Sequence, residues 1–209
     1  MPSIPKGRNE KGKFLNKHLS FKAKVRRFLN CTASDDVFDM FAGDGEMYRR
    51  CYGKAKSGVT CDLEDNCIER AAMDRPRWIC LQVNVEKILR AGLWRDRPFS
   101  IIDIDCFGSP WKFFAGLFKF RRSLANPCRL VLTDNYMTHR NLSHEDLVLE
   151  FRKPGSPEEY LAAVDRLMKK TVVAQGWSYD RKLYRDGTCV NHLITMSRPA
   201  AIAVGDTGG

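Results

Sequence analysis

The chain has 209 residues, of which 44% are hydrophobic and 29% charged, a composition typical of one soluble α/β domain with a sizeable core. It contains no apolar run of the roughly 18–20 residues that a membrane-spanning helix needs, and its N-terminus lacks the apolar segment of a secretory signal. The eight cysteines include no C-x-x-C pair and several lie in apolar runs, which favours free thiols and a cytoplasmic location over zinc or disulfides.

The net charge of +10 is concentrated near the N-terminus. Residues 1–30 contain nine Lys and Arg but one acidic residue. Such a basic segment suits nucleic-acid phosphates through counterion release, and the alternative is a solvated tail that keeps the protein soluble. We therefore divide the chain into a basic extension with an amphipathic helix (1–30), a main domain (31–199) and a flexible tail (200–209).

Apolar spacing predicts a regular alternation of helices and strands through the first two thirds of the chain. Helices are expected at residues 14–29, 45–52, 63–74, 85–92 and 111–125. Strands are expected at residues 37–43, 57–62, 79–84, 99–105 and 129–136. This alternation indicates βαβ units and a doubly wound, mostly parallel sheet.

The last third carries different signals. A capping box beginning at Ser156 predicts a helix that ends at Gly176. Two strand-like runs follow, at 177–184 and 188–196, and the Asp-Gly pair at 186–187 between them is typical of a hairpin turn. An antiparallel C-terminal hairpin added to the five preceding strands gives a sheet of seven.

Polar residues and glycines follow the predicted strands at their carboxyl ends, where open α/β sheets bind ligands. Asp39 lies in the first strand, which is expected to end at Gly43, and Gly43 and Gly45 then allow a tight turn close to a ligand. Asp62, about twenty residues further on, has the position of a carboxylate that accepts ribose hydroxyls. Asn84 ends the third strand with an amide suited to an adenine. Taken singly, Asp62 and Asn84 have alternative roles as a helix cap and a turn former.

Two nucleotide motifs are missing from the sequence. Tyr48 stands at the third glycine position of G-x-G-x-x-G, which disfavours a pyrophosphate and therefore NAD. No G-x-x-x-x-G-K-[ST] stretch is present, so phosphoryl transfer from a nucleotide is not expected. An adenosine cofactor without phosphates fits the strand ends better.

The stretch DMFAGDGEMYRR resembles the first motif of class I S-adenosylmethionine-dependent methyltransferases. More narrowly, IIDIDCFGSPWKFF resembles the Asp-Pro-Phe-Gly-Ser-Pro stretch of the tRNA (guanine-N(2)) dimethyltransferases, LVLTDNYM is similar to their fifth strand, and FLNKHL is similar to their N-terminal Phe-Tyr-Asn motif. The resemblance covers residues 31–199 and implies a Rossmann-like methyltransferase fold with S-adenosyl-L-methionine as cofactor. The sequence departs from the family at Cys106, where the family has proline, and we expect no counterpart of its C-terminal tRNA-binding domain.

The strand ends and the resemblance together predict three sets of site residues. The cofactor-binding set is Asp39, Phe41, Ala42, Gly43, Gly45, Asp62, Leu63, Asn84, Val85 and Asp103. The catalytic set is Asp105, Phe107 and Asp103. The substrate-binding set is Gly108, Ser109, Pro110, Asp134 and Tyr136.

The resemblance implies that Asp105 accepts a hydrogen bond from an exocyclic amine and stabilises the charge that develops as this amine attacks the methyl group. Phe107 would stack on the target base. Capping of the following helix is the alternative for Asp105, and core packing is the alternative for Phe107.

Four functions compete. The favoured one is methylation of a guanine amine in a tRNA-like RNA, because of the DIDCFGSP stretch and the basic extension. The others are methylation of DNA adenine, methylation of a small molecule, and a non-catalytic nucleic-acid-binding subunit with a decayed site, which Cys106 keeps open.

Overall fold

A computed structural model of the chain describes residues 18–43, 45–92, 96–106, 109–118, 124–134, 156–186 and 189–199. Three predicted site residues, Phe107, Gly108 and Tyr136, lie outside the described residues, as do the segment 1–17 and the tail 200–209. Within the described part of the chain, no helix is long and apolar enough to cross a lipid bilayer.

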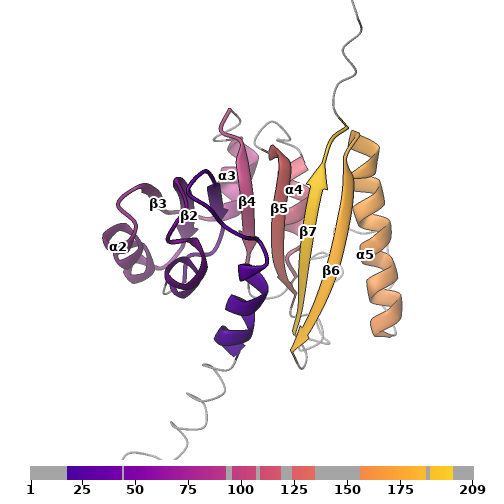
Figure 1. The fold of residues 1–209 in the computed structure, drawn as a ribbon, viewed down its shortest axis with the longest axis horizontal. Coiled ribbons are helices and arrows are strands. Elements are labelled where there is room, and N and C mark those ends of the chain that lie inside the picture. Colours follow the sequence, from indigo (N-terminus) through magenta and orange to yellow (C-terminus); the bar gives the residue numbers. More distant parts are fainter. Residues whose placement is uncertain are drawn as a thin grey trace, which may run out of the picture.

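Seven strands form one sheet in the order β3-β2-β1-β4-β5-β7-β6 (Figure 1). They are β1 (Asp36–Asp39), β2 (Ser57–Asp62), β3 (Trp78–Gln82), β4 (Phe99–Ile104), β5 (Leu124–Asp134), β6 (Ser178–Asp186) and β7 (Cys189–Ser197). All neighbours pair in parallel except β7, which is antiparallel to both β5 and β6. The predicted doubly wound, mostly parallel sheet with a C-terminal antiparallel hairpin is confirmed.

Helical segments cover both faces of this sheet. One face, here called the front face because it faces the viewer in Figure 1, is covered by the helix at residues 18–27 and a π-helical turn, η1 (Tyr48–Tyr52). The opposite, rear face is covered by α3 (Val85–Ala91), α4 (Trp111–Phe118) and α5 (Pro157–Thr171). A further helix, α2 (Asp65–Asp74), packs beside β2 and β3. The helix at residues 18–27 is therefore part of the same layered body as the sheet.

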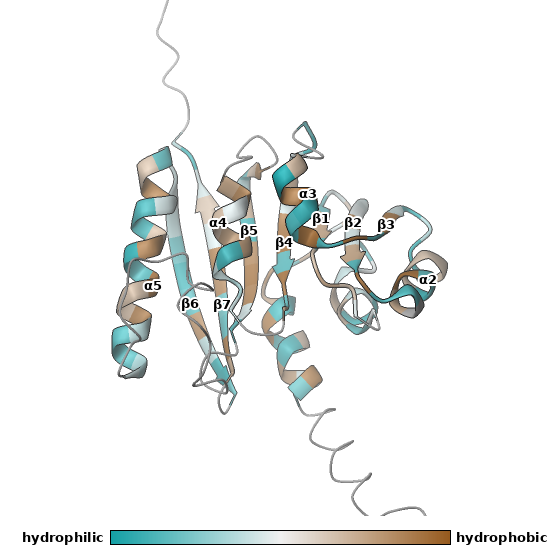
Figure 2. Cartoon of the chain, turned by 180° about the vertical axis from the view of Figure 1, so that it is seen from behind, coloured by the Kyte–Doolittle hydropathy of each residue, from teal (hydrophilic) through white to brown (hydrophobic). Residues whose placement is uncertain are grey.

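Strand β4 shows how the sequence produces this architecture. Its run FSIIDI has apolar residues on both faces of the strand, as expected for a central strand covered on both sides. Ile102 points into the rear core and Ile101 into the front core, and both are fully buried. Figure 2, seen from the rear, shows the same hydrophobic character along β4 and β5. Asp103 is the exception: it is a charged residue in a buried strand, and it needs a partner.

Helix limits follow the local signals in the sequence. The Ser156 hydroxyl accepts a hydrogen bond from the Glu159 amide at 3.2 Å, so the predicted cap of α5 is confirmed. The helix ends earlier than expected, at Thr171, and a short 3-10 turn then leads to Gly176, which has a φ of 76°. Gly92, with a φ of 64°, closes α3 as predicted.

The predicted boundary between the helix after β4 and the strand β5 is wrong. The helix expected over residues 111–125 ends by Phe118 in the described residues, and Leu124 and Ala125 already belong to β5. Leu124 pairs with Phe99, and the register shifts before the next pairing. The Asn-Pro pair at 126–127 lies within this irregular part of the strand, where proline is tolerated because a bulge needs no ladder hydrogen bond from it. The apolar spacing alone predicts a helix that runs up to this Asn-Pro pair.

The glycine at position 58 provides a test of the packing on the front face. A Cβ on Gly58 would lie 2.6 Å from the Trp78 ring, a contact that neither the backbone nor a buried indole relieves easily. We expect Gly58→Ala to lower the free energy of unfolding by about 1–3 kcal/mol. Gly53→Ala is the matched control, since its Cβ would approach no atom closer than 3.7 Å, and it should stay within about 0.5 kcal/mol of wild type in urea unfolding. Equal stability of the two variants would contradict this packing.

Candidate functional site

The loop after β1 forms the first part of the candidate site. Gly43 and Gly45 have φ values of 48° and 73°, which explains the need for glycine at both positions. A Cβ on Gly43 would meet nothing within 4 Å, so this part of the loop borders open space. The Gly43 amide donates to Asp62 Oδ2 at 2.9 Å, which ties the loop to the end of β2. The glycine loop and Asp62, separated by nineteen residues in sequence, are thus brought together.

Asp62 and Asn84 keep unused hydrogen-bonding capacity. Asp62 Oδ1 accepts from the Glu64 amide at 3.0 Å, so each carboxylate oxygen has one backbone donor and a second lone pair. Asn84 Oδ1 accepts a hydrogen bond from the Glu86 amide at 2.8 Å and so caps α3. The side-chain NH₂ group of Asn84 takes no part in this cap and can donate to a ligand. Leu63, between these strand ends, is 62% exposed and offers an apolar surface. Asn84 therefore caps α3, whereas the N-cap of α2 is Glu64, so the helix cap considered for Asp62 is not formed. Neither set of contacts prevents ligand binding.

The remaining residues of the predicted cofactor set support the loop from below. Ala42 and Val85 are buried, and Phe41 is half-buried with its ring edge-on to Phe113 at 5.0 Å between centroids. Their assignment to cofactor binding stays a prediction.

The second part of the site is a group of three carboxylates on the front face. Asp39 and Asp103 are register partners on β1 and β4, and Asp105 follows β4 two residues later. The side chains of Asp39 and Asp103 are 4% and 1% exposed, whereas that of Asp105 is 16% exposed. Asp105 is therefore the carboxylate of the three that reaches the surface at the carboxyl edge of the sheet.

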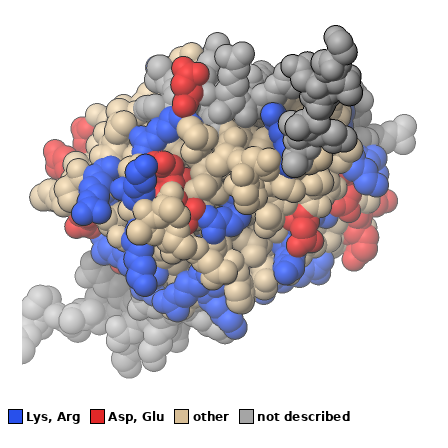
Figure 3. All heavy atoms as spheres, turned by 45° about the horizontal axis from the view of Figure 1, so that its top comes forward, with Lys and Arg blue, Asp and Glu red and all other residues tan. Residues whose placement is uncertain are grey.

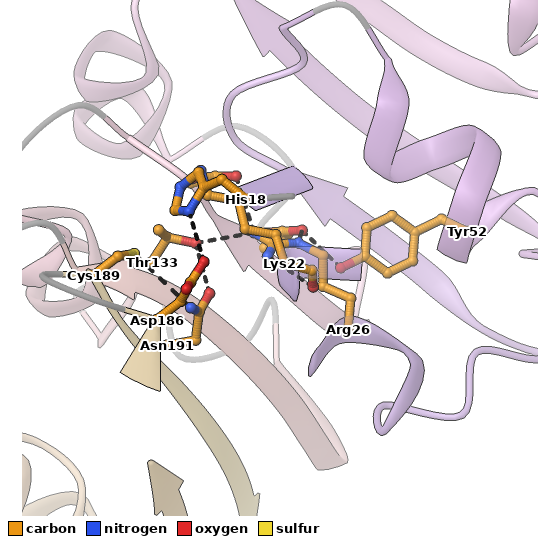
Figure 4. A network of polar contacts seen from close by, with 10 residues as sticks. His18, Lys22, Arg26, Tyr52, Thr133, Asp186, Cys189 and Asn191 are labelled. Atoms are coloured by element: carbon orange, nitrogen blue, oxygen red, sulfur yellow. Dashed lines mark hydrogen bonds and ion pairs between the residues drawn. The ribbon is translucent and has the colours of Figure 1, made fainter. Parts of the chain in front are cut away.

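Each carboxylate has a cation of its own. Arg26, which is fully buried, forms a bidentate pair with Asp103, with Nε–Oδ2 and Nη2–Oδ1 distances of 2.5 and 2.6 Å. Lys22, one turn earlier on the same helix, donates to Asp105 Oδ1 at 2.6 Å. Figure 4 shows Lys22 and Arg26 side by side, with Tyr52 reaching the same cluster from η1. The helix at residues 18–27 thus supplies two of the three cations.

Arg75 is the third cation. Its Nη1 lies 3.2 Å from Asp39 Oδ2, and its guanidinium carbon lies 4.8 and 5.3 Å from the ring centroids of Tyr48 and Trp78. Arg75 also explains the small residue at position 45, because a Cβ on Gly45 would lie 3.0 Å from its Nη2. Gly45 therefore serves the packing of the front face as well as the turn of the loop.

Burial and ion pairing have opposite effects on the acidity of these groups. Desolvation raises the pKa of Asp39 to about 7, and it outweighs the opposing effect of Arg75. Desolvation also acts on Asp105, but Arg26 and Lys22 together hold the pKa of Asp105 below its ordinary value. Asp105 is thus ionised at neutral pH because two cations face it.

Asp103 does not have the environment of a catalytic group. Besides Arg26, it accepts a hydrogen bond from the Tyr52 hydroxyl at 2.7 Å. Both oxygens are occupied and the side chain is buried. These contacts favour a role in holding the helix at residues 18–27 over contact with a cofactor or substrate.

The loop that follows Asp105 is described at both of its ends. Cys106 is 4% exposed and packs in the rear core, where burial raises the pKa of its thiol to about 12. It is therefore a neutral, small core residue at the position where the resembling family has proline. Ser109 and Pro110 are buried at the start of α4, where the Ser109 hydroxyl accepts from the Trp111 amide at 3.5 Å. These contacts indicate that they support the loop.

Asp134 lies on the other side of the sheet from Asp105. Its Oδ2 accepts hydrogen bonds from Trp111 Nε1 at 2.9 Å and from the Tyr160 hydroxyl at 2.5 Å, and His192 Nε2 lies 3.5 Å away. The Asp134 side chain is 1% exposed and belongs to the rear face. The structure does not bring it together with Asp105, and its contacts favour anchoring α4 and α5 over binding substrate.

The sequence reading missed the partners of the carboxylates. The charge pattern places Lys22 and Arg26 in the basic, phosphate-binding segment, and nothing in it indicates Arg75 or Tyr52 as partners of these carboxylates. The available signal was the helical spacing: Lys22 and Arg26 are four residues apart, and Arg26 lies three residues after Ala23 and three before Leu29, both of which are buried. An arginine on the apolar stripe of a helix indicates an internal partner.

No family model matches the sequence. No curated protein matches it either.

Solved structures, by contrast, match across most of the chain. Trm1 from Pyrococcus horikoshii, in complex with S-adenosyl-L-methionine, superposes with a TM-score of 0.63 and 14% identity over 87% of this chain and 55% of Trm1. The plantazolicin methyltransferase BamL, with S-adenosylhomocysteine, gives 0.58 and 12% identity over 91% of this chain and 90% of its own. The fold is that of S-adenosylmethionine-dependent methyltransferases.

A third neighbour extends the range of substrates among similar folds. An rRNA methylase from Streptococcus thermophilus gives a TM-score of 0.51 and 12% identity over 95% of this chain and 99% of its own. The chain spans about half of the length of Trm1. Because the identities are low, these neighbours establish the fold, and the chemistry must be argued from the site.

The pair between Arg26 and Asp103 gives a test of how the site is held together. Arg26→Met leaves Asp103 as a buried charge with no cation of its own, and we expect a loss of about 3–5 kcal/mol in the free energy of unfolding. Adding Asp103→Asn removes that charge and should recover part of the loss, with a coupling energy of about 1–3 kcal/mol in a double-mutant cycle from urea unfolding. Additive losses would show that the pair does not stabilise the fold.

Proposed function

We propose that this protein is an S-adenosyl-L-methionine-dependent methyltransferase that modifies the exocyclic amine of a base in RNA, most simply the amine of guanine in a tRNA-like substrate. The observation that carries the proposal is the joint arrangement at the carboxyl edge: a glycine loop open to solvent and tied to Asp62, next to an ionised Asp105 at the end of β4. The methyltransferase fold of the whole chain supports the same assignment.

The residues present fit an adenosine cofactor that lacks phosphates. Asp62 retains one lone pair on each oxygen for the two ribose hydroxyls, and Asn84 retains its amide NH₂ for the ring. The exposed Leu63 offers the apolar contact that an adenine ring needs. The neighbours Trm1 and BamL hold S-adenosyl-L-methionine and S-adenosylhomocysteine, respectively.

Asp105 carries the chemistry in this proposal. When bound, S-adenosyl-L-methionine supplies the electrophilic methyl group. The exocyclic amine of a base is a poor nucleophile because its lone pair is delocalised into the ring. Asp105 accepts a hydrogen bond from that amine, aims its lone pair, stabilises the positive charge that develops on nitrogen and takes up the released proton. Phe107 would stack on the base, as the motif implies.

A nucleic-acid substrate is supported by charge. Figure 3 shows several separate groups of Lys and Arg, most of them in the left and lower parts of the visible surface, with Asp, Glu and uncharged residues between them. On the helix at residues 18–27, Lys24 and Arg27 are exposed and can contact phosphates, whereas Arg26 is buried in its ion pair with Asp103. The neighbours include Trm1, a tRNA guanine-N2 dimethyltransferase, and an rRNA methylase. RNA is therefore our first choice, ahead of DNA adenine and of small molecules, although the plantazolicin methyltransferase BamL shows that similar folds also serve other substrates.

Two variants distinguish the residue that carries out methyl transfer from the residue that binds the cofactor. Asp105→Asn removes the charge that stabilises the transition state, so methyl transfer should fall about 10²–10³-fold with the affinity for S-adenosyl-L-methionine unchanged in calorimetry. Asp62→Ala removes the ribose acceptor, and affinity should fall about tenfold or more. Thermal unfolding of each variant controls for misfolding.

Two results would defeat the proposal. One is the absence of any heat of binding for S-adenosyl-L-methionine or S-adenosylhomocysteine with wild-type protein. The other is full activity of Asp105→Asn. Parallel assays of methyl transfer to total tRNA, rRNA and DNA identify the substrate class, and a steep loss of RNA binding with rising salt is expected if phosphates are contacted.

A further inference from the structure

Lys22 is the side chain closest to the proposed catalytic carboxylate. Its Nζ lies 2.6 Å from Asp105 Oδ1, and the side chains of Lys22 and Asp105 are 13% and 16% exposed. Most lysines of a basic segment are solvated, but this one is held between its helix and the tip of β4. Its position gives it a part in the chemistry that is different from contact with phosphate.

The charges on the front face balance only if Lys22 is included. The three carboxylates Asp39, Asp103 and Asp105 are faced by Arg75, Arg26 and Lys22, respectively. Arg26 also approaches Asp105 Oδ2 at 3.2 Å, but both of its shorter contacts go to Asp103. Without Lys22, two neighbouring carboxylates would share one guanidinium, an arrangement in which one of them tends to protonate.

The geometry leaves room for a substrate on the same carboxylate. An ionised carboxylate has about four lone-pair positions. Lys22 occupies one on Oδ1, Arg26 approaches Oδ2, and the Thr133 hydroxyl is a third hydrogen-bond donor, so that one position remains for an incoming amine. Two cations on different oxygens also fix the plane of the carboxylate. A group held in this way can present a free lone pair in one direction to an incoming amine.

We propose that Lys22 is a positioning residue for methyl transfer: it fixes the orientation of the Asp105 carboxylate and keeps it ionised while the substrate amine binds. The inference rests on the role of Asp105 in the proposed function. It assigns the helix at residues 18–27 a direct influence on the rate, in place of a purely electrostatic attraction for RNA.

Other groups around Asp105 set the background of this effect. Among the described residues, those that interact with Asp105 are Lys22 and Arg26 from the N-terminal helix, Asp39 from β1, Cys106 in the following loop, Thr133 from β5 and Cys189 from β7. The surrounding polar network also includes His18, Tyr52, Asp103 and Asp186. His18 lies one turn before Lys22 and pairs with Asp186 at 3.3 Å. Asp39, whose pKa burial raises to about 7, adds a second titration near neutral pH. The variants below leave all of these groups except Lys22 in place.

The first test reads the Asp105 carboxylate directly. In ¹³C-aspartate NMR titrations of full-length protein, with Asp105→Asn to assign the signal, Lys22→Met should raise the pKa of Asp105 by about one unit or more. Lys22→Arg should restore most of the wild-type value. Lys24→Met is the matched control, because it removes the same charge from an exposed position of the same helix, and it should leave this pKa unchanged. An equal pKa in wild type and Lys22→Met would overturn the proposal, whatever the enzyme's activity.

The second test uses the rate. Activity needs ionised Asp105, so a raised pKa moves the acidic limb of the kcat profile to higher pH; in Lys22→Met we expect a shift of about one pH unit or more and about a tenfold loss of kcat below the limb. KM for RNA should stay close to wild type. A higher KM, a salt slope reduced by about one and an unmoved limb would assign Lys22 to phosphate binding and overturn the inference. If wild type transfers no methyl group to any substrate, the proposed function fails, and the NMR titration still decides what Lys22 does to Asp105.

Discussion

The bidentate pair between Arg26 and Asp103 connects the start of the described chain to the centre of the sheet. Its partners are 77 residues apart in sequence, and both are buried. Leaving either one alone would place an uncompensated charge in the protein interior, which costs several kcal/mol. The pair therefore fixes where the helix at residues 18–27 lies on the front face. Once this helix is fixed, Lys22 necessarily comes to the end of β4, and the environment of Asp105 follows from it.

The front face shows how one sheet can hold three acidic side chains close together. Even with Arg75 beside it, burial raises the pKa of Asp39 to about 7. Asp105 has a lowered pKa because it reaches the carboxyl edge and meets two cations there. The same sheet therefore contains a carboxylate that tends toward the neutral form and another that stays charged. Their difference arises from position and partners, since the residue type is identical, and it favours Asp105 as the group that faces a substrate.

Much of this fold follows from local patterns. Alternating apolar runs predicted all seven strands, and the glycine loop and Asp62 were predicted to lie at neighbouring strand ends, where they share a hydrogen bond. The sequence did not reveal which face of a strand holds the site. Asp134 ends β5 as Asp105 follows β4, yet strand alternation turns Asp134 to the rear face, where it pairs with Trp111. The long-range partner of Arg26 was equally invisible, because a count of charges by segment does not show which side of a helix each charge occupies.

The substitution at Cys106 bears on whether the site is intact. Proline at this position in the resembling family restricts the backbone after the catalytic aspartate. Here the side chain is instead buried in the rear core, and its raised pKa of about 12 makes it an unreactive thiol. The buried Cys106 side chain thus holds the backbone at this position, as the proline ring does in the resembling family. The orientation of Asp105 comes from Lys22 and Arg26 on the opposite face. Cys106 therefore does not indicate a decayed site, because the groups that orient the Asp105 carboxylate and keep it ionised do not involve residue 106.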